Sequence, residues 1–252
     1  TITGPNIAST ISGGTGNDTI TGGTQADIIS GGAGNDTLTG SAGSDTFYIT
    51  AGDDIITDLS ADDILIVSDG ASVTAQNIVS FTANNLTRNE GITNLIAGDT
   101  GATIDISSAL GSGNYILTGG IGEDKLVGND KNNIFVGNGG TDEFKGNSGT
   151  DLFNINIGTG NIVDLNTGDI FLVSEGASVI ATNIFSFVAT NETESLGTAY
   201  LYGRETGSTI DMSQAPQGAF TIIGGGGIDY ITGGRGSDIL TGGDANDTFF
   251  IG

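Results

Sequence analysis

Three residue types are missing from this chain of 252 residues, which has no cysteine, no histidine and no tryptophan. Without cysteine there are no disulfides, a composition compatible with secretion when metal ions stabilise the fold instead. Basic residues are scarce, since six Lys and Arg stand against 30 Asp and Glu, for a formal charge of -24. Such a charge opposes attraction to nucleic acids and to anionic membranes. No apolar run approaches the roughly 18 residues that a membrane span requires, so we expect neither nucleic-acid binding nor membrane insertion.

The same absences argue against an enzyme. The carboxylate pairs Asp53-Asp54 and Asp62-Asp63 could act as an acid and a base, as in glycosidases, but no His, Cys or Trp accompanies them to form a catalytic or sugar-stacking cleft. We interpret them as solvated turns or as additional cation sites. The repeated Gly-x-Gly could suggest a phosphate loop, but such a loop opens a helix, and no segment has a convincing helical period. We therefore expect no catalytic residues and no nucleotide cofactor.

Glycine is abundant instead, with 45 residues that lack the three-residue period of collagen. A hydrophobic content of 36% is too high for a disordered linker, so the glycines punctuate a folded repeat. From Gly13 to Tyr48 the chain reads as four nine-residue units, GGTGNDTIT, GGTQADIIS, GGAGNDTLT and GSAGSDTFY. An apolar residue stands at the eighth place of each unit and Asp at the sixth, where the four residues are Asp18, Asp27, Asp36 and Asp45.

This nine-residue period predicts the fold. The glycine-rich half of each unit can turn tightly because Gly tolerates positive φ, and the triplet around each apolar residue alternates like a short strand. Two units then form one coil of two strands and two turns, and coils stacked about 4.8 Å apart make neighbours of Asp18 and Asp36. Stacked carboxylates repel each other, and a chain without His or Cys offers only hard oxygen donors, which suit Ca²⁺. Metal-free glycine turns are the alternative.

Two further blocks keep the period. The block at 119–154 reads GGIGEDKLV, GNDKNNIFV, GNGGTDEFK and GNSGTDLFN, in which Asn133 interrupts the Asp row and Asn replaces the second Gly of three units. We expect fewer or weaker calcium sites there. The block at 224–252 begins GGGGIDYIT, GGRGSDILT and GGDANDTFF. Residues 4–12 keep the apolar period with Ser9 at the Asp place, which predicts a metal-free coil segment.

These units resemble the calcium-binding nonapeptide of RTX proteins, G-G-x-G-x-D-x-U-x. The resemblance implies that the first six residues of a unit form a calcium-binding turn and the last three a strand of a parallel β-roll. It implies side-chain ligands at Asp18, Asp27, Asp36, Asp45, Asp124, Asp142, Asp151, Asp229, Asp238 and Asp247, and carbonyl ligands at Gly13, Thr15, Gly22, Thr24, Gly31, Ala33, Gly119, Gly137, Gly224 and Gly233.

The blocks are separated by two inserts that are copies of each other. Residues 56–81 match residues 162–187, and residues 100–107 match residues 206–213, both at an offset of 106. Apolar runs of strand length in the first copy lie at 55–56, 64–67, 78–81, 93–97, 103–106 and 115–117. We favour a continuation of the solenoid by longer coils, because Ile56 and Ile162 keep the nine-residue step after Phe47 and Phe153. A small β-sandwich that bulges from the roll is the alternative.

The predicted fold class is all-β, a parallel β-roll or β-helix solenoid with calcium-binding turns, interrupted by two homologous β-rich inserts. The segments are 1–48, 49–118, 119–154, 155–223 and 224–252. The inserts also resemble, more loosely, segments of large repetitive bacterial surface proteins such as adhesins and surface-layer proteins. This resemblance implies an extracellular, cell-surface location in bacteria.

Three functions remain open. The first, which we favour, is a calcium-stabilised structural module of a surface layer, adhesin stalk or filament. The second is the calcium-dependent secretion tail of a type I-secreted toxin or hydrolase, although such a tail usually has one uninterrupted array. The third is a module that binds ice or polysaccharide, with the inserts as ligand faces.

The expected partners are other copies of the chain and a cell-surface polysaccharide. Thr1 begins within a strand and Phe249-Phe250-Ile251 ends on one, so both ends of the solenoid would expose unpaired backbone. This arrangement predicts head-to-tail association, into a filament or a sheet, in the presence of calcium. Asn85 and Asn191 begin matched glycosylation sequons in the two inserts, and the sequence leaves their modification open.

Overall fold

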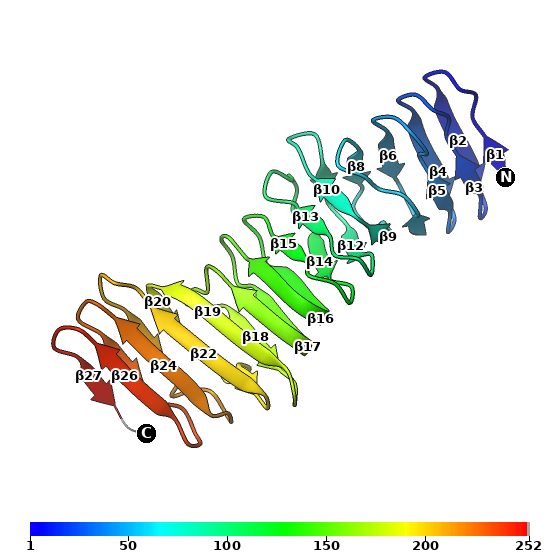
Figure 1. The fold of residues 1–252 in the computed structure, drawn as a ribbon. Helices are drawn as coiled ribbons and strands as arrows, with labels where there is room; N and C mark the ends of the chain where they lie inside the picture. Colours follow the sequence, from blue (N-terminus) through cyan, green and yellow to red (C-terminus); the bar gives the residue numbers. More distant parts are fainter. Residues whose placement is uncertain (251–252) are drawn as a thin grey trace.

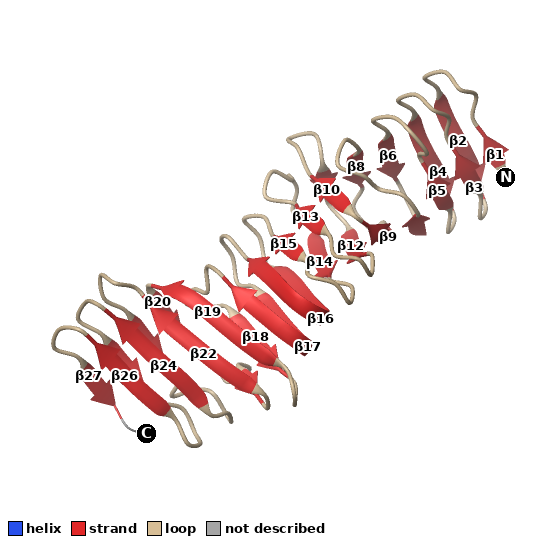
Figure 2. Ribbon diagram, in the orientation of Figure 1, coloured by secondary structure: helices blue, strands red, loops and turns tan. Residues whose placement is uncertain are grey.

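The computed structural model describes residues 1–250, and these residues form strands and turns with no helix among them (Figure 2). It follows that no helix in this range is long and apolar enough to cross a membrane. Figure 1 shows the coils stacked along one axis, from the N-terminus in blue at the upper right to the C-terminus in red at the lower left. Ile251, which was predicted to belong to a closing strand, lies outside the described residues.

The strands follow the nine-residue period in the first block and become longer and less regular beyond it. Those of the first block and the start of the first insert are β1 (Ile2–Thr3), β2 (Thr10–Thr15), β3 (Thr19–Thr21), β4 (Ile28–Ala33), β5 (Thr37–Thr39), β6 (Thr46–Ile49) and β7 (Asp53–Ile56). The rest of the first insert contains β8 (Ile64–Val67), β9 (Ser72–Ile78), β10 (Ser80–Thr82), β11 (Arg88–Asn89), β12 (Ile92–Ala97), β13 (Thr103–Asp105) and β14 (Asn114–Thr118). The middle block contains β15 (Lys125–Val127), β16 (Asn133–Lys145) and β17 (Leu152–Ile162).

The second insert repeats the pattern of the first. Its strands are β18 (Ile170–Val173), β19 (Ser178–Ile184), β20 (Ser186–Val188), β21 (Glu194–Ser195), β22 (Thr198–Gly203) and β23 (Thr209–Asp211). The last strands are β24 (Phe220–Gly225), β25 (Tyr230–Thr232), β26 (Ile239–Gly243) and β27 (Thr248–Phe250).

All pairings between named strands are parallel, and they set the length of each coil. In the first block, Ile11 pairs with Ile29, and Ile20 with Leu38, a step of two units. The inserts use longer coils, since Val67 pairs with Asn89 and Leu95 with Leu117. The predicted continuation of the solenoid through the inserts is therefore confirmed, and the alternative of a separate β-sandwich is wrong. The division into five segments stays a prediction, because the ladders run across the segment boundaries.

Each insert ends one ladder of paired strands and begins another. The sheet of β2, β4, β6 and β8 ends at β11, while β10 starts a new ladder that continues through β13 and β15. In the second insert the ladder through β18 ends at β21, and β20 starts the sheet of β23, β25 and β27. The pair of sheets that encloses the core is thus replaced step by step along the axis.

The core is a single apolar column inside the coils. The eighth-place residues Ile20, Ile29, Leu38 and Phe47 are fully buried, and the middle block places Phe135, Phe144 and Phe153 in the same column. The rings of Phe135 and Phe153 stack with centroids 5.0 Å apart. Burial of such side chains contributes about 1.5–3 kcal/mol each relative to an exposed position, so the apolar period stabilises the stack throughout.

Two details differ from the sequence prediction. β2 and β4 extend through Thr15 and Ala33, so the first three residues of the predicted turns belong to the ladder. Glycine allows this close approach, because a Cβ on Gly32 would lie 2.1 Å from the carbonyl oxygen of Gly14. The predicted run at 78–81 is two strands rather than one, since the positive φ of Asn77 bends the chain and β9 ends at Ile78 before β10 begins.

Candidate metal centre

The sixth-place Asp residues point into the coils rather than into solvent. Asp27, Asp36 and Asp45 are each 1% exposed. Asp18 is only half-buried, as are Asp238 and Asp247. The remaining predicted carboxylates are buried, namely Asp124, Asp142, Asp151 and Asp229. An unpaired buried carboxylate is costly, so these side chains need partners.

In most of these carboxylates, one oxygen finds its partner in the preceding coil, whereas both oxygens of Asp229 have none among the described residues. The backbone N–H of Asp18 donates to Oδ1 of Asp36 at 2.7 Å, and that of Asp36 donates to Oδ1 of Asp54 at 2.9 Å. The middle block has the same contact, in which the N–H of Asp124 donates to Oδ1 of Asp142 at 3.1 Å. Ser9, at the Asp place of the predicted metal-free segment, donates its N–H to Asp27 at 2.8 Å and its hydroxyl to the carbonyl of Ile7 at 2.7 Å. The carboxylates thus form directional ladders along the axis.

The second oxygen of the carboxylate faces the first glycine of its own unit. A Cβ on Gly31 would lie 1.9 Å from Oδ2 of Asp36, and one on Gly224 would lie 2.3 Å from Oδ2 of Asp229. The same close approach occurs at Gly13, Gly22, Gly119, Gly137 and Gly233. No other residue type fits there, which explains why Gly and Asp recur together at this spacing.

Several of these second oxygens have no hydrogen-bond partner among the described residues. They include the buried Oδ2 atoms of Asp36, Asp54 and Asp151. Burial raises the pKa of Asp54, Asp142 and Asp169 to about 6 and that of Asp151 to about 8, against an ordinary value of 3.8, while backbone hydrogen bonds partly oppose the shift. A proton or a cation would stabilise these oxygens.

The residues predicted to supply carbonyl ligands lie partly in strands and partly in exposed turns. Gly13, Thr15, Gly31 and Ala33 all lie in the β2–β4 ladder, where the carbonyl of Ala33 accepts the N–H of Gly16 at 2.7 Å. Thr24 is exposed, and its carbonyl accepts the side-chain amide of Gln25. The structure therefore brings each first glycine to the Asp of its unit. The carbonyl ligands stay a prediction.

Three carboxylates of the ladders were not among the predicted ligands. Asp54 and Asp63 are 2% and 3% exposed, so for these two the solvated turn is wrong and the additional cation site stays a prediction, whereas Asp53 and Asp62 are exposed. The N–H of Asp45 donates to Oδ1 of Asp63 at 2.8 Å, and in the second copy the N–H of Asp151 donates to Asp169 at 3.0 Å. The nine-residue step from Asp45 could have identified Asp54 and Asp63, although the two glycines that open a unit are absent there.

Two more carboxylates close the rows of turns where the inserts begin. Asp58 accepts the N–H groups of Gly40 and Ser41, at 2.9 and 2.7 Å. Asp164 accepts those of Gly146 and Asn147 in the same way, at 2.9 and 2.8 Å. Successive N–H groups in such a turn form a concave anion site, so each carboxylate caps the last turn of a block.

Amide side chains replace carboxylates in the middle block. Oδ1 of Asn133 accepts the N–H of Asn129 at 2.9 Å, and its Nδ2 donates to Oδ1 of Asn129 at 3.1 Å. Asn138 donates to the carbonyl of Gly119 at 2.9 Å, and Asn147 donates to that of Gly128 at 2.7 Å. These neutral contacts satisfy the turn without a cation and occupy carbonyls that an ion would otherwise use.

The donor set fits a hard cation on two observations. Carboxylate oxygens of Asp36, Asp54 and Asp151 are buried without partners, and glycines such as Gly31 leave room beside such oxygens that a Cβ would fill. Within residues 1–250, no three or more acidic side chains are arranged so that they alone could hold a metal ion. An ion there would need most of its ligands from backbone carbonyls, as Ca²⁺ accepts in many proteins.

Comparison with known proteins agrees with this chemistry. The family model described as the RTX calcium-binding nonapeptide repeat (4 copies) matches residues 12–47, 39–73, 118–153 and 221–250, which together cover half of the chain. The second of these segments includes Asp54 and Asp63. No curated protein matches the chain.

Proposed function

The chain belongs to the RTX calcium-binding nonapeptide repeat family, and from this premise we propose that it is a structural module of a bacterial surface assembly, folded by calcium outside the cell. The repeats of this family bind calcium, and proteins that carry them are typically secreted. The surface assembly, the absence of catalysis and the bacterial cell surface as location are part of the proposal.

The observation that carries the proposal is the set of buried Oδ2 atoms of Asp36, Asp54 and Asp151, which have no partner in a chain of formal charge -24. Bound calcium would neutralise these carboxylates and link the turns of adjacent coils. The side chains that would hold it are the sixth-place Asp residues, together with Asp54, Asp63 and Asp169, and the carbonyls of the glycine turns would supply the rest. The Gly beside each Asp keeps the carboxylate accessible to the turn.

The continuous solenoid supports a structural role over a secretion tail. Both inserts carry the parallel ladders from one block to the next, so each copy of 106 residues extends the stack instead of interrupting it. A secretion tail has no need of a duplicated insert. The neighbouring sequence distinguishes the two, because further copies of the 106-residue unit support the module and an adjoining catalytic domain supports the tail.

The calcium concentration of a compartment would determine whether the chain folds there. Extracellular calcium modules bind with a Kd of about 10⁻⁴–10⁻³ M, so the chain should remain unfolded at cytosolic calcium and fold at extracellular calcium. Folding would then be confined to the compartment where the assembly is built.

The direct test is a calcium titration followed by circular dichroism. We expect a cooperative gain of β-structure at roughly 10⁻⁴–10⁻³ M Ca²⁺, reversed by chelator, and no gain with Mg²⁺ at the same concentration. A β-spectrum that is unchanged after thorough chelation would rule out calcium-coupled folding.

Self-association belongs to the same proposal. Each coil offers N–H groups to the carboxylates of the coil that follows it, as between Asp18 and Asp36, and this pattern supports head-to-tail stacking of copies. Light scattering and negative-stain imaging in millimolar Ca²⁺ and in chelator test it. A monodisperse monomer at high protein concentration and saturating Ca²⁺ would exclude stacking by this segment alone.

A further inference from the structure

Each insert forms a surface pocket at the same place, and the two pockets differ in chemistry. The pocket of the second copy has a volume of about 330 Å³ and that of the first about 440 Å³. The residues that line the second pocket include Phe185, Ser186, Thr206, Thr209, Ile228 and Tyr230. Those of the first include Val79, Thr100, Ala102, Thr103 and Glu123. Duplication has thus kept the backbone and changed the side chains.

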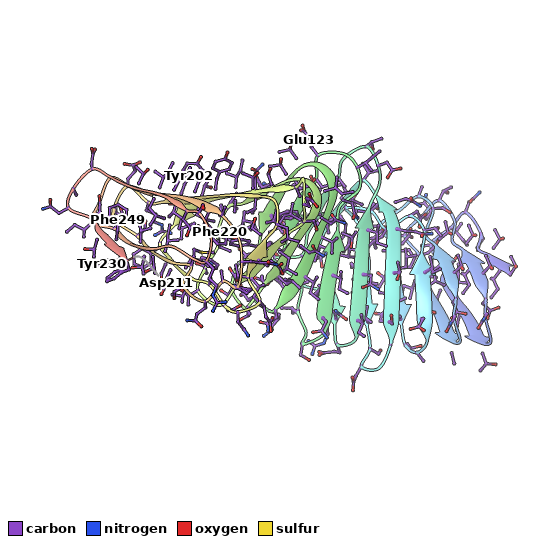
Figure 3. All side chains as sticks on the ribbon, turned by 90° about the horizontal axis from the view of Figure 1, so that it is seen from below. Glu123, Tyr202, Asp211, Phe220, Tyr230 and Phe249 are labelled. Atoms are coloured by element: carbon purple, nitrogen blue, oxygen red, sulfur yellow. The ribbon has the colours of Figure 1, made fainter. Side chains whose placement is uncertain are left out.

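Apolar side chains form the walls of the second pocket. Phe185 is 62% exposed, Ile228 56% and Tyr230 49%, so all three present a large apolar surface to solvent. The matching places of the first copy hold Val79, Glu123 and Lys125. Figure 3 shows Tyr230 on the lower side of the view and Glu123 on the upper side, so the two pockets also face different directions.

The exposed ring of Phe185 is held in place by a cation. The guanidinium carbon of Arg204 lies 5.2 Å from the centroid of this ring, and Nε of Arg204 donates to the carbonyl of Asn183 at 3.0 Å. A cation over an aromatic face is attracted by the ring. The first copy has Gly98 in place of Arg204, so both the ring and its support are specific to the second copy.

Hydroxyl groups lie beside the aromatic walls. Ser186 pairs with Thr209, and Thr209 pairs with Tyr230, so these three side chains stand on neighbouring strands in one row. Thr206 is exposed at the rim. Hydroxyls donate and accept hydrogen bonds, so the pocket combines apolar ring faces with uncharged polar groups.

We propose that this pocket binds one pyranose unit of a neutral polysaccharide. A sugar ring has an apolar C–H face, which suits Phe185 and Tyr230, and a rim of hydroxyls, which suits Ser186, Thr206 and Thr209. The volume of about 330 Å³ lies within the range of small-molecule pockets. The formal charge of -24 and the neighbouring Glu205 oppose an anionic glycan. This binding site goes beyond the structural role proposed above.

The test compares the wild-type chain with Phe185→Val, which installs the residue of the first copy, in saturating Ca²⁺. The probes are dextran, yeast mannan and soluble β-1,3-glucan, with hyaluronan as the anionic counterpart, and binding is measured by calorimetry and by ligand-observed NMR. We expect at least one neutral glycan to bind and Phe185→Val to weaken it by about tenfold. Val79→Ala in the first copy is the matched control and should bind as the wild type does.

The outcomes separate clearly. Absence of binding to all three neutral glycans, equal affinity of the Phe185→Val variant, or binding of hyaluronan alone would overturn the proposal. Tyr230→Thr, which copies Thr248 of the next coil, provides a second variant in case the first does not fold. Circular dichroism in Ca²⁺ reports folding independently, so a chain that folds with calcium and binds no glycan contradicts only this inference.

Discussion

The first block, Gly13 to Tyr48, and the middle block, 119–154, share one backbone plan but stabilise it differently. In the first block, the Oδ2 atom of Asp36 is buried and unpaired. In the middle block the Oδ2 atom of Asp151 is likewise unpaired. There, however, Asn133 and Asn129 satisfy each other, and Asn138 and Asn147 bond to the turn carbonyls. The turn geometry thus tolerates either a carboxylate that needs a cation or an amide that does not.

The apolar cores of the two blocks also differ. The first block fills its column mostly with Ile and Leu, whereas the middle block stacks Phe135 against Phe153 and tilts Phe144 against both. Aromatic pairs contribute about 0.5–1.5 kcal/mol beyond their buried area. The block whose Asp row is interrupted at Asn133 therefore has the stronger apolar column, and we expect it to depend less on calcium.

Removal of calcium should produce the largest difference in stability between the two blocks. At 100-fold excess over its Kd, one bound ion stabilises the folded state by about 2.7 kcal/mol, and the first block has the longer unbroken Asp row. We expect the amides of residues 13–48 to lose protection against hydrogen exchange in chelator while those of residues 128–154 remain protected. Mass spectrometry of both states measures this, and equal loss in the two blocks would refute the comparison.

Acidification should restore part of the structure lost in chelator. A carboxyl whose pKa is raised in the folded state holds its proton more tightly when folded, so the metal-free chain is most stable below about pH 4 and loses stability as the pH rises. The loss should pass through pH 6, where Asp54 and Asp142 ionise, and end near pH 8 with Asp151. Urea midpoints in chelator at pH 5 and pH 8.5 measure it. A higher urea midpoint at pH 8.5 than at pH 5 would contradict the raised pKa values of these buried carboxyls.

Substitution of one carboxylate in each block, at the sixth place of its unit, tests the difference between the two blocks. Asp36→Ala and Asp142→Ala each remove the acceptor of one N–H bond, at a cost of about 1–3 kcal/mol. Asp36→Ala should also reduce the calcium affinity of the chain more than Asp142→Ala does. The Asp row around Asp36 is unbroken, whereas Asp142 lies beside the gap at Asn133. We expect a larger shift of the calcium midpoint for Asp36→Ala, and equal shifts of the two variants would count against unequal sites.

The substitution Asn133→Asp should make the middle block resemble the first. It removes the bond from Nδ2 of Asn133 to Asn129 and adds a buried charge, so we expect a loss of about 1–2 kcal/mol in chelator. Part of this loss should be recovered in saturating calcium. Denaturant unfolding in both conditions measures the difference, with Asn132→Asp as an exposed control that should leave stability nearly unchanged.

The period of nine predicted the coil and the stacking of Asp residues eighteen apart, because glycine turns and apolar strands fix the register. It did not predict that these side chains are buried inside the coils. It missed Asp169, which follows Asp151 by two units across a position where Gly160 interrupts the row. The longer coils of the inserts could not be predicted in register, since the pairing of Val67 with Asn89 depends on packing against the preceding coil. The amide bonds of Asn138 and Asn147 also depend on turn geometry that composition does not reveal.

The exchange of sheets at each insert has a consequence for any array built from this unit. When the five-stranded sheet ends at β11 and β10 opens a new ladder, a different pair of strand faces encloses the core. Equivalent side chains of successive copies then follow a spiral instead of a line. A fibre with this screw-like display would present the same surface to neighbours on several sides, and it would be suited to a cross-linked mesh more than to a flat ribbon.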